Sequence, residues 1–246
     1  MNHDLDERHD ATRRTLHRIA NHVLARAQQA ETGLVGLRAT PGGFATTTIR
    51  PDRERIRISG GTLVREAAAA DGTWTRSIGI DGSTLAELAA FADVDLSAEF
   101  SAGQDTPPLG DIGELIVLHV ASARLIGHWY GVVTEALDQL VRSAPAFSAP
   151  SLVQVWPEHF DAALDMAFDA ASPTERRVNI GGSPGDSFHA APYLYVGPWT
   201  PDRPGDPAFW NAPFGAVLGY GDIATSPDPV EAAYVFMASG LDRLTG

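Results

Sequence analysis

The sequence predicts an α+β protein of two similar lobes, in which short antiparallel strands pack on a long central helix between outer N- and C-terminal helices. Three observations predict this fold. Apolar residues recur at helical spacing in three long stretches. Short runs of β-branched, aromatic or alternating residues lie between turns rich in glycine and proline. The order of a helix, several strands and a closing helix occurs over residues 7–92 and again over 111–244.

The first half of the chain predicts a helix, a set of strands and a short helix. Residues 7–30 carry apolar side chains at helical spacing, and Gly33 supplies the stop. The short helix is predicted to begin after Thr84, which can form a capping box with Glu87, and to end near Ala92. Strands are predicted over residues 34–40, 44–49, 55–59, 62–67 and 73–80, the last of them after the hairpin signal Asp71-Gly72.

The second half predicts a long helix, further strands and a closing helix. Residues 97–110 have the composition of a linker, so the expected lobes are residues 1–96 and 111–246, which together can form one compact domain. The long helix, over about 111–141, is apolar on most faces and is therefore expected in the middle of the molecule. Strands are predicted over 152–156, 177–180 and 193–196, and the closing helix over 228–244, with Asp228 as its cap and Pro229 at its first position.

The segment 160–168 fits two patterns. At helical spacing, Phe160, Leu164 and Phe168 lie on one side, and the alanine content and Pro157 favour a helix. With a period of two, the apolar residues alternate with polar neighbours, which favours a strand. The residues alone leave both structures open.

Composition excludes several kinds of chemistry. The chain contains neither lysine nor cysteine, so all 18 basic residues are arginine. Schiff-base chemistry, a pyridoxal-phosphate anchor and a P-loop lysine are therefore excluded, as are thiol nucleophiles, disulfides and cysteine metal sites. The chemistry that remains is that of hydroxyl, carboxylate, imidazole and guanidinium groups.

The charge predicts a protein that binds neither nucleic acid nor membrane, because both need clustered positive charge. The formal net charge is −13 and the pI is about 4.9. The densest arginine run, residues 50–57, contains two acidic residues and is expected on a solvated edge strand. The polar N-terminus and the interrupted apolar stretch 115–140 predict a cytoplasmic protein. Arginine without lysine, with abundant alanine and glycine, indicates a GC-rich bacterial genome.

The run Val153 to Asp161, VQVWPEHFD, resembles a segment of uncharacterised bacterial proteins, common in actinobacteria, that carry a domain of unknown function. In those proteins an aromatic strand leads through a short turn into a Phe-Asp-Leu-Ala type of strand, and a glycine- or serine-containing loop, an aromatic strand and a final helix follow. The resemblance covers most of the chain by layout and about thirty residues by motif, and this chain differs in its Pro157-Glu158-His159 turn. It implies no activity, but it favours a strand for residues 160–168.

Residue types that carry chemistry are densest between residues 156 and 211. The candidates for catalytic roles are His159, Asp161, Asp186 and His189. The candidates for the wall of a ligand pocket are Trp156, Tyr193, Tyr195 and Trp199. We expect them to bind or turn over a small molecule in a cleft between the lobes by carboxylate and imidazole chemistry. In an enzyme, His159 would be the general base and Asp161 its orienting partner.

Other interpretations of this region stay open. The four histidine and aspartate side chains are also donors of the kind that hold a divalent metal, although no cofactor is favoured. Ser183 or Ser187 could be a nucleophile activated by one of the two histidines. The aromatic region 192–210 could be the surface of a homodimer or of a non-catalytic interaction protein. Finally, the aromatic residues could form ordinary core, and the Ser183 to Asp186 run an ordinary tight loop.

Besides His9, four further histidines lie on the predicted helices. His17 and His22 fall on different faces of the first helix, which suggests only solvation. His119 and His128 fall on the same side of the long helix and are expected to be hydrogen-bonded at the edge of an apolar seam.

Overall fold

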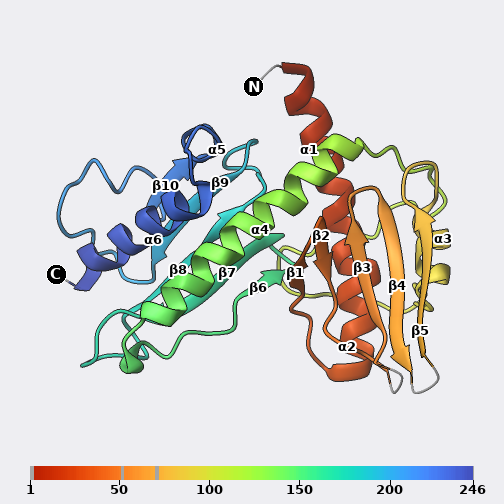
Figure 1. Ribbon diagram of the computed structural model, residues 1–246, viewed down its shortest axis with the longest axis horizontal. Coiled ribbons are helices and arrows are strands. Elements are labelled where there is room, and N and C mark those ends of the chain that lie inside the picture. Colours follow the sequence, from red (N-terminus) through yellow and green to blue (C-terminus); the bar gives the residue numbers. More distant parts are fainter. Residues whose placement is uncertain (1–2, 51–52, 70–71, 246) are drawn as a thin grey trace. The chain divides into compact units, whose positions relative to one another are not determined.

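The computed structural model describes residues 3–50, 53–69 and 72–245 (Figure 1). It confirms the predicted α+β class, with two five-stranded antiparallel sheets and helices at both ends of the chain. The strand orders are β1-β2-β3-β4-β5 and β10-β9-β8-β7-β6. The chain forms two compact units: the first contains residues 1–131 and 155–160, and the second contains residues 132–154 and 161–246.

The N-terminal helical stretch is confirmed, but it is not one regular α-helix. It consists of α1 (His3–Ile19), the π-helix η1 (Ala20–Ala25) and α2 (Arg26–Thr32). Gly33 ends it in the left-handed conformation, with φ of 74°, as the stop signal predicts. Every residue of η1 is buried, Asn21 and His22 included. Wide helical turns of this kind are frequent at functional sites.

The sheet of the first unit has the predicted order of hairpins. Its strands are β1 (Arg38–Thr40), β2 (Gly43–Ala45), β3 (Arg55–Ser59), β4 (Thr62–Ala69) and β5 (Gly72–Gly79). Isoleucines 56 and 58 of β3 face the core, and Arg55 and Arg57, which alternate with them, share Glu66 of β4 as an ion-pair partner. The expectation of an edge strand is wrong, because β3 lies between β2 and β4. Asp71, the first residue of the predicted hairpin signal, lies outside the described residues.

The short helix α3 (Leu85–Phe91) has the predicted capping box between Thr84 and Glu87. The long helix α4 (Val120–Ser143) begins about two and a half turns later than residue 111, where its apolar pattern predicts the start. Residues 112–118 instead run beside 81–86, where Ile116 exchanges backbone hydrogen bonds with Gly82 and Ser83. Pairing with this neighbouring segment therefore overrides the helical spacing.

Helix α4 crosses the boundary between the units, since its residues up to 131 belong to the first and the rest to the second. In the first unit it lies against the turn between β1 and β2. A Cβ atom on Gly127 would stand 2.3 Å from the carbonyl carbon of Gly42, so only glycine permits this approach. Trp129 and Tyr130 of the same helix are buried in the core of the first unit.

The second unit contains most of the other sheet. The strands are β6 (Gln154–Trp156), β7 (Asp161–Ala167), β8 (Arg177–Ser183), β9 (Tyr193–Pro198) and β10 (Ala216–Gly219). The strand interpretation of 160–168 is confirmed. Helix α6 (Pro229–Thr245) packs on β9, where Gly240 lies against Val196, and Asp228 caps it as predicted (Figure 1). The short helices η2 (Ala146–Ser148) and α5 (Tyr220–Ala224) were not predicted, nor was β10.

No helix within residues 3–50, 53–69 and 72–245 combines the length and the apolar character that crossing a membrane requires.

Candidate functional site

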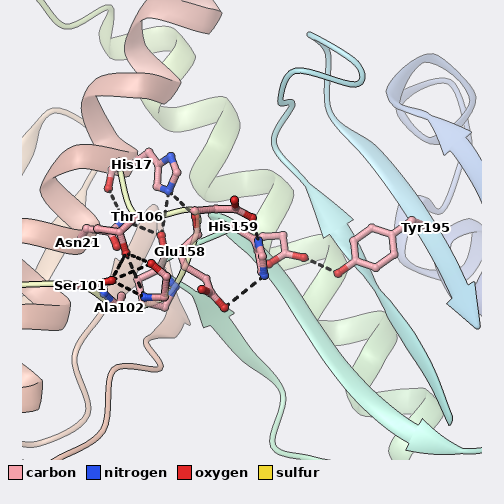
Figure 2. A network of polar contacts seen from close by, with 12 residues as sticks. His17, Asn21, Ser101, Ala102, Thr106, Glu158, His159 and Tyr195 are labelled. Carbon is pink, nitrogen blue, oxygen red and sulfur yellow. Dashed lines mark hydrogen bonds and ion pairs between the residues drawn. The ribbon is translucent and has the colours of Figure 1, made fainter. Parts of the chain in front are cut away.

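The turn that carries His159 is fixed to the N-terminal helix by two buried polar side chains (Figure 2). Nε2 of His17 lies 2.9 Å from the carbonyl oxygens of both Pro157 and Glu158. The amide of Asn21 donates to the Pro157 carbonyl at 2.6 Å and to the His17 carbonyl at 2.9 Å. The backbone of the turn therefore has little freedom before any ligand arrives.

His17 is a neutral, buried imidazole. Burial lowers its pKa from 6.5 to about 4, although the two carbonyls favour the charged form. Its ring stacks on Phe160 with 5.1 Å between centroids. Because Nε2 faces two carbonyl acceptors, the proton of the neutral ring lies on Nε2. The expectation that His17 is simply solvated is wrong, and so is the same expectation for His22, which is 3 % exposed.

His159 lies between two carboxylates. Its Nδ1 is 3.2 Å from Oδ2 of Asp105, and its Nε2 is 3.3 Å from Oε1 of Glu158 (Figure 2). The ring is 51 % exposed, so it remains open to a ligand. Asp105 and Glu158 thus hold the place beside His159 that the sequence analysis gave to Asp161.

Asp105 comes from the segment that its composition marks as a linker. Residues 101–106 form a tight loop in which the side chains of Ser101 and Thr106 satisfy the backbone. The Thr106 hydroxyl accepts from the N–H groups of Ala102 and Gly103 and donates to the Gly103 carbonyl. The Glu158 carboxylate lies against Gly103, at the place that a Cβ atom would occupy. The loop and the turn are therefore fitted to each other.

A cavity of about 590 Å³ lies beside this loop. It is lined by His22 and Arg26 of the helix and by most of residues 96–109, including the two neighbours of Asp105. Nε2 of His22 lies 2.8 Å from the Pro107 carbonyl, and burial lowers the pKa of this ring. Arg26 donates to the Ala98 carbonyl at 2.6 Å and lies over the Phe100 ring at 5.7 Å. The size is within the range of small-molecule pockets.

Two predicted site residues of the second unit meet in its sheet. The hydroxyl of Tyr195 on β9 donates a short hydrogen bond to Oδ2 of Asp161 on β7. Burial, together with the negative charge of Asp161, raises the pKa of Tyr195 well above its ordinary value. Asp161 is 7 % exposed, so the pair is part of the interior of this sheet.

Asp186 organises the loop between β8 and β9. Its Oδ1 accepts from the N–H groups of Phe188 and His189, and its Oδ2 accepts from the Tyr193 hydroxyl at 2.6 Å. Ser183 is buried and donates to the same Oδ2 at 3.4 Å. Burial, reinforced by Asp186, raises the pKa of Tyr193. Nδ1 of His189 lies 2.8 Å from the Ala191 carbonyl, so these contacts resemble turn chemistry more than a serine nucleophile with its base.

The predicted aromatic wall is dispersed. Tyr193 and Tyr195 lie 6.4 Å apart between ring centroids, and their hydroxyls have carboxylate partners. Trp199 follows the other end of β9, is 55 % exposed and donates from Nε1 to Asn179. Trp156 is half-buried on β6 and belongs to the first unit.

The structure thus divides the predicted catalytic residues between the units, with His159 in the first and Asp161, Asp186 and His189 in the second. Sequence reasoning missed His17, His22, Arg26 and Asp105. The first three flank the apolar stripe of the first helix, which was a usable signal; Asp105 lies in a segment without periodicity. Within the described parts of the chain, no group of three or more histidine or acidic side chains is arranged to hold a metal.

Comparison with known proteins adds no relative. No protein-family model matches the sequence, and no curated protein and no solved structure is significantly similar to it. The resemblance of residues 153–161 to an uncharacterised bacterial family therefore stays a prediction, and the site must be interpreted from its own geometry.

Proposed function

We propose that the first unit binds a small organic molecule and that His159 accepts a proton from it or donates one to it. The observation that carries the proposal is the half-exposed imidazole between Asp105 and Glu158, on a turn fixed by His17 and Asn21. The cavity beside the Asp105 loop supplies the space for the ligand.

The two carboxylates give His159 the properties of a proton-transfer group. A neutral imidazole has one N–H, so it can donate to only one of them, and its other nitrogen then faces an acceptor. An imidazolium has two N–H groups and can donate to both carboxylates at once. Asp105 orients the ring through Nδ1, and the proton exchanged with a substrate resides on Nε2 beside Glu158.

The proposal predicts a proton-exchange activity that depends on His159. In D₂O, the protein should accelerate loss of the α-proton signal of phenylpyruvate or of the neutral ketone phenylacetone, followed by proton NMR. The variant His159→Gln should lose about a hundredfold of this rate, the usual contribution of a positioned acid or base. The exposed His128 on α4 provides the matched control His128→Gln, which should keep the full rate.

Two outcomes would contradict this proposal. Equal exchange rates for the wild type and His159→Gln would exclude proton transfer by this ring. Equal loss in both histidine variants would show that the effect is not local. Because one probe is anionic and the other neutral, the result does not depend on the charge that the ligand site prefers.

We propose as a second candidate that the second unit carries a self-association surface. Trp199, Phe188 and Phe214 are 55 %, 45 % and 38 % exposed, and the two phenylalanine rings are in edge contact at 5.0 Å. Exposed aromatic side chains are typical of the centres of protein interfaces. Light scattering should then show a dimer that Trp199→Ala and Phe188→Ala dissociate. A monomeric wild type at high concentration would exclude this candidate.

A further inference from the structure

We infer that the cavity of the first unit takes a small anion that carries a flat, unsaturated or aromatic group, with Arg26 as the anion-binding residue. The inference rests on the proposed function, because it names the ligand class of the same cavity. It is carried by two features: a guanidinium that has no acid partner among the described residues, and an aromatic platform beside it.

Arg26 is the first of these features. Arg26 is only 9 % exposed. Within the described ranges, the one hydrogen-bond acceptor of its guanidinium is the Ala98 carbonyl. No carboxylate forms an ion pair with it in that part of the chain. A guanidinium has five N–H groups, so most of them stay available. The N–H groups without a partner are therefore available to an anion in the cavity that Arg26 lines.

The nearest carboxylates are engaged elsewhere or exposed. Asp95 feels the charge of Arg26, but its pKa is lowered chiefly by hydrogen bonds from the backbone and the hydroxyl of Ser97. Glu99 lines the cavity and is exposed to solvent. Burial lowers the pKa of His22, so this ring is neutral near pH 7 and Arg26 supplies the positive charge of the lining.

The second feature is the platform formed by Phe100. Arg26 lies over its ring, and His22 meets it edge-on at 6.1 Å between centroids. Leu96 and Leu109 add apolar lining, so a flat group has an aromatic face and aliphatic walls to contact. Ser97, Ser101 and Thr106 also line the cavity, but their hydroxyls already donate to Asp95 and to the Gly103 carbonyl. A planar carboxylate or a phosphate ester suits the fork of donors on Arg26.

The experiment compares four probes that share one ring. Benzoate represents the carboxylates and phenyl phosphate the phosphate esters, whereas benzamide is neutral and benzylamine is a cation. Binding is followed through the Nε–H signal of Arg26 and the methyl signals of Leu96 and Leu109 in protein NMR. We expect at least one anion to shift all three signals, and to bind at least about tenfold more tightly than benzamide. The anion that binds shows whether the cavity takes a carboxylate or a phosphate ester.

Two substitutions test the role of Arg26. Arg26→Gln should lower the affinity for the anion to the affinity measured for benzamide. Arg26→Lys should still bind the anion more tightly than benzamide. The matched control is Arg14→Gln, which removes the same charge from the exposed side of α1. If Arg26→Gln does not fold, the wild type remains informative: raising the salt from about 0.02 M to about 0.5 M should weaken anion binding but not benzamide binding.

Each outcome decides something. If benzamide or benzylamine binds as tightly as the anions, the ligand class is wrong while the cavity remains a binding site. If none of the four probes shifts the leucine methyl signals, the inference is wrong, and the exchange experiment on His159 then decides the proposed function by itself. If Arg14→Gln weakens anion binding as much as Arg26→Gln does, the anion is attracted by the general charge of the protein and Arg26 is not the binding residue.

Discussion

His17 shows how a single residue can be essential to a site that it does not enter. Its ring is neutral, stacks on Phe160 and holds the Pro157–Glu158 backbone, so its role is to position the turn from which His159 extends. The sequence contains a sign of this burial, because His17 lies beside Leu16, one turn before Ala20 and two turns before Leu24 on the apolar side of the helix. Solvation was expected because His17 and His22 fall on different faces of the helix.

The buried His17 predicts acid sensitivity. Its pKa is about 4 in the folded protein and 6.5 in the unfolded chain, so the unfolded state binds an extra proton between these values. Its contribution to stability is therefore complete above pH 6.5 and is lost as the pH falls towards 4. The full loss is about 3 kcal/mol of the free energy of unfolding. Urea unfolding at several pH values should show a flatter profile for His17→Gln than for the wild type.

The control for this prediction is His128→Gln, which alters an exposed ring on α4. It should keep the pH profile of the wild type, because the carboxylates that titrate in the same range are unchanged. If His17→Gln and the wild type lose stability in parallel between pH 6.5 and 4, His17 does not carry a lowered pKa in the folded state.

At the scale of elements, the sequence predicted regular structure well where periodicity and turn chemistry agree. Strand β3 has the predicted bounds, and the capping box at Thr84 and the stop at Gly33 are present. Helix α4 begins late because residues 112–118 find hydrogen-bond partners in a neighbouring segment, which an apolar pattern cannot reveal. Nearly every residue of β7 is buried, which explains why its sequence fits both a helix and a strand.

The candidate site was only partly predictable, for a related reason. His159 stood out because of its acidic neighbours, but the partner Asp105 comes from 54 positions earlier in a stretch without any period. A stretch rich in glycine, proline and serine has the same composition whether it is a linker or an ordered loop. The hydroxyls of Ser101 and Thr106 make it an ordered loop here. The π-helix that contributes Asn21 and His22 has no signal of its own in the sequence.

At the scale of the whole molecule, the chain leaves the first unit within α4 and returns to it at residues 155–160. The returning segment supplies Phe160, which is buried against Phe44 and Tyr130 and accepts a hydrogen bond from the Tyr130 hydroxyl at 2.8 Å. Val155 pairs with Leu37 through two backbone hydrogen bonds of 2.9 Å. The first unit is therefore discontinuous in sequence, whereas composition suggested a division at 97–110.

This discontinuity predicts that the first unit cannot fold well from its N-terminal piece alone. Phe160→Ala in the full chain should lower the free energy of unfolding by about 3–5 kcal/mol, as for other buried aromatic residues. A fragment of residues 1–131 should give poorly dispersed amide NMR signals, and addition of a peptide covering residues 150–162 should improve them. The control peptide carries Phe160→Ala. A fragment that is fully folded without any peptide would contradict the prediction.

Because Gly103 lies against the Glu158 side chain, a substitution at residue 103 should affect activity without affecting folding. A methyl group on residue 103 would stand 1.3 Å from a carboxylate oxygen, but that oxygen ends a flexible side chain that can swing aside. Gly103→Ala is thus nearly silent in a thermostability screen, while it removes one of the two acids from His159. Natural variation at the two positions is expected to be epistatic: a larger residue at 103 becomes acceptable only when residue 158 has a smaller side chain. A mutational scan scored on proton exchange would reveal the pair, where one scored on expression would not.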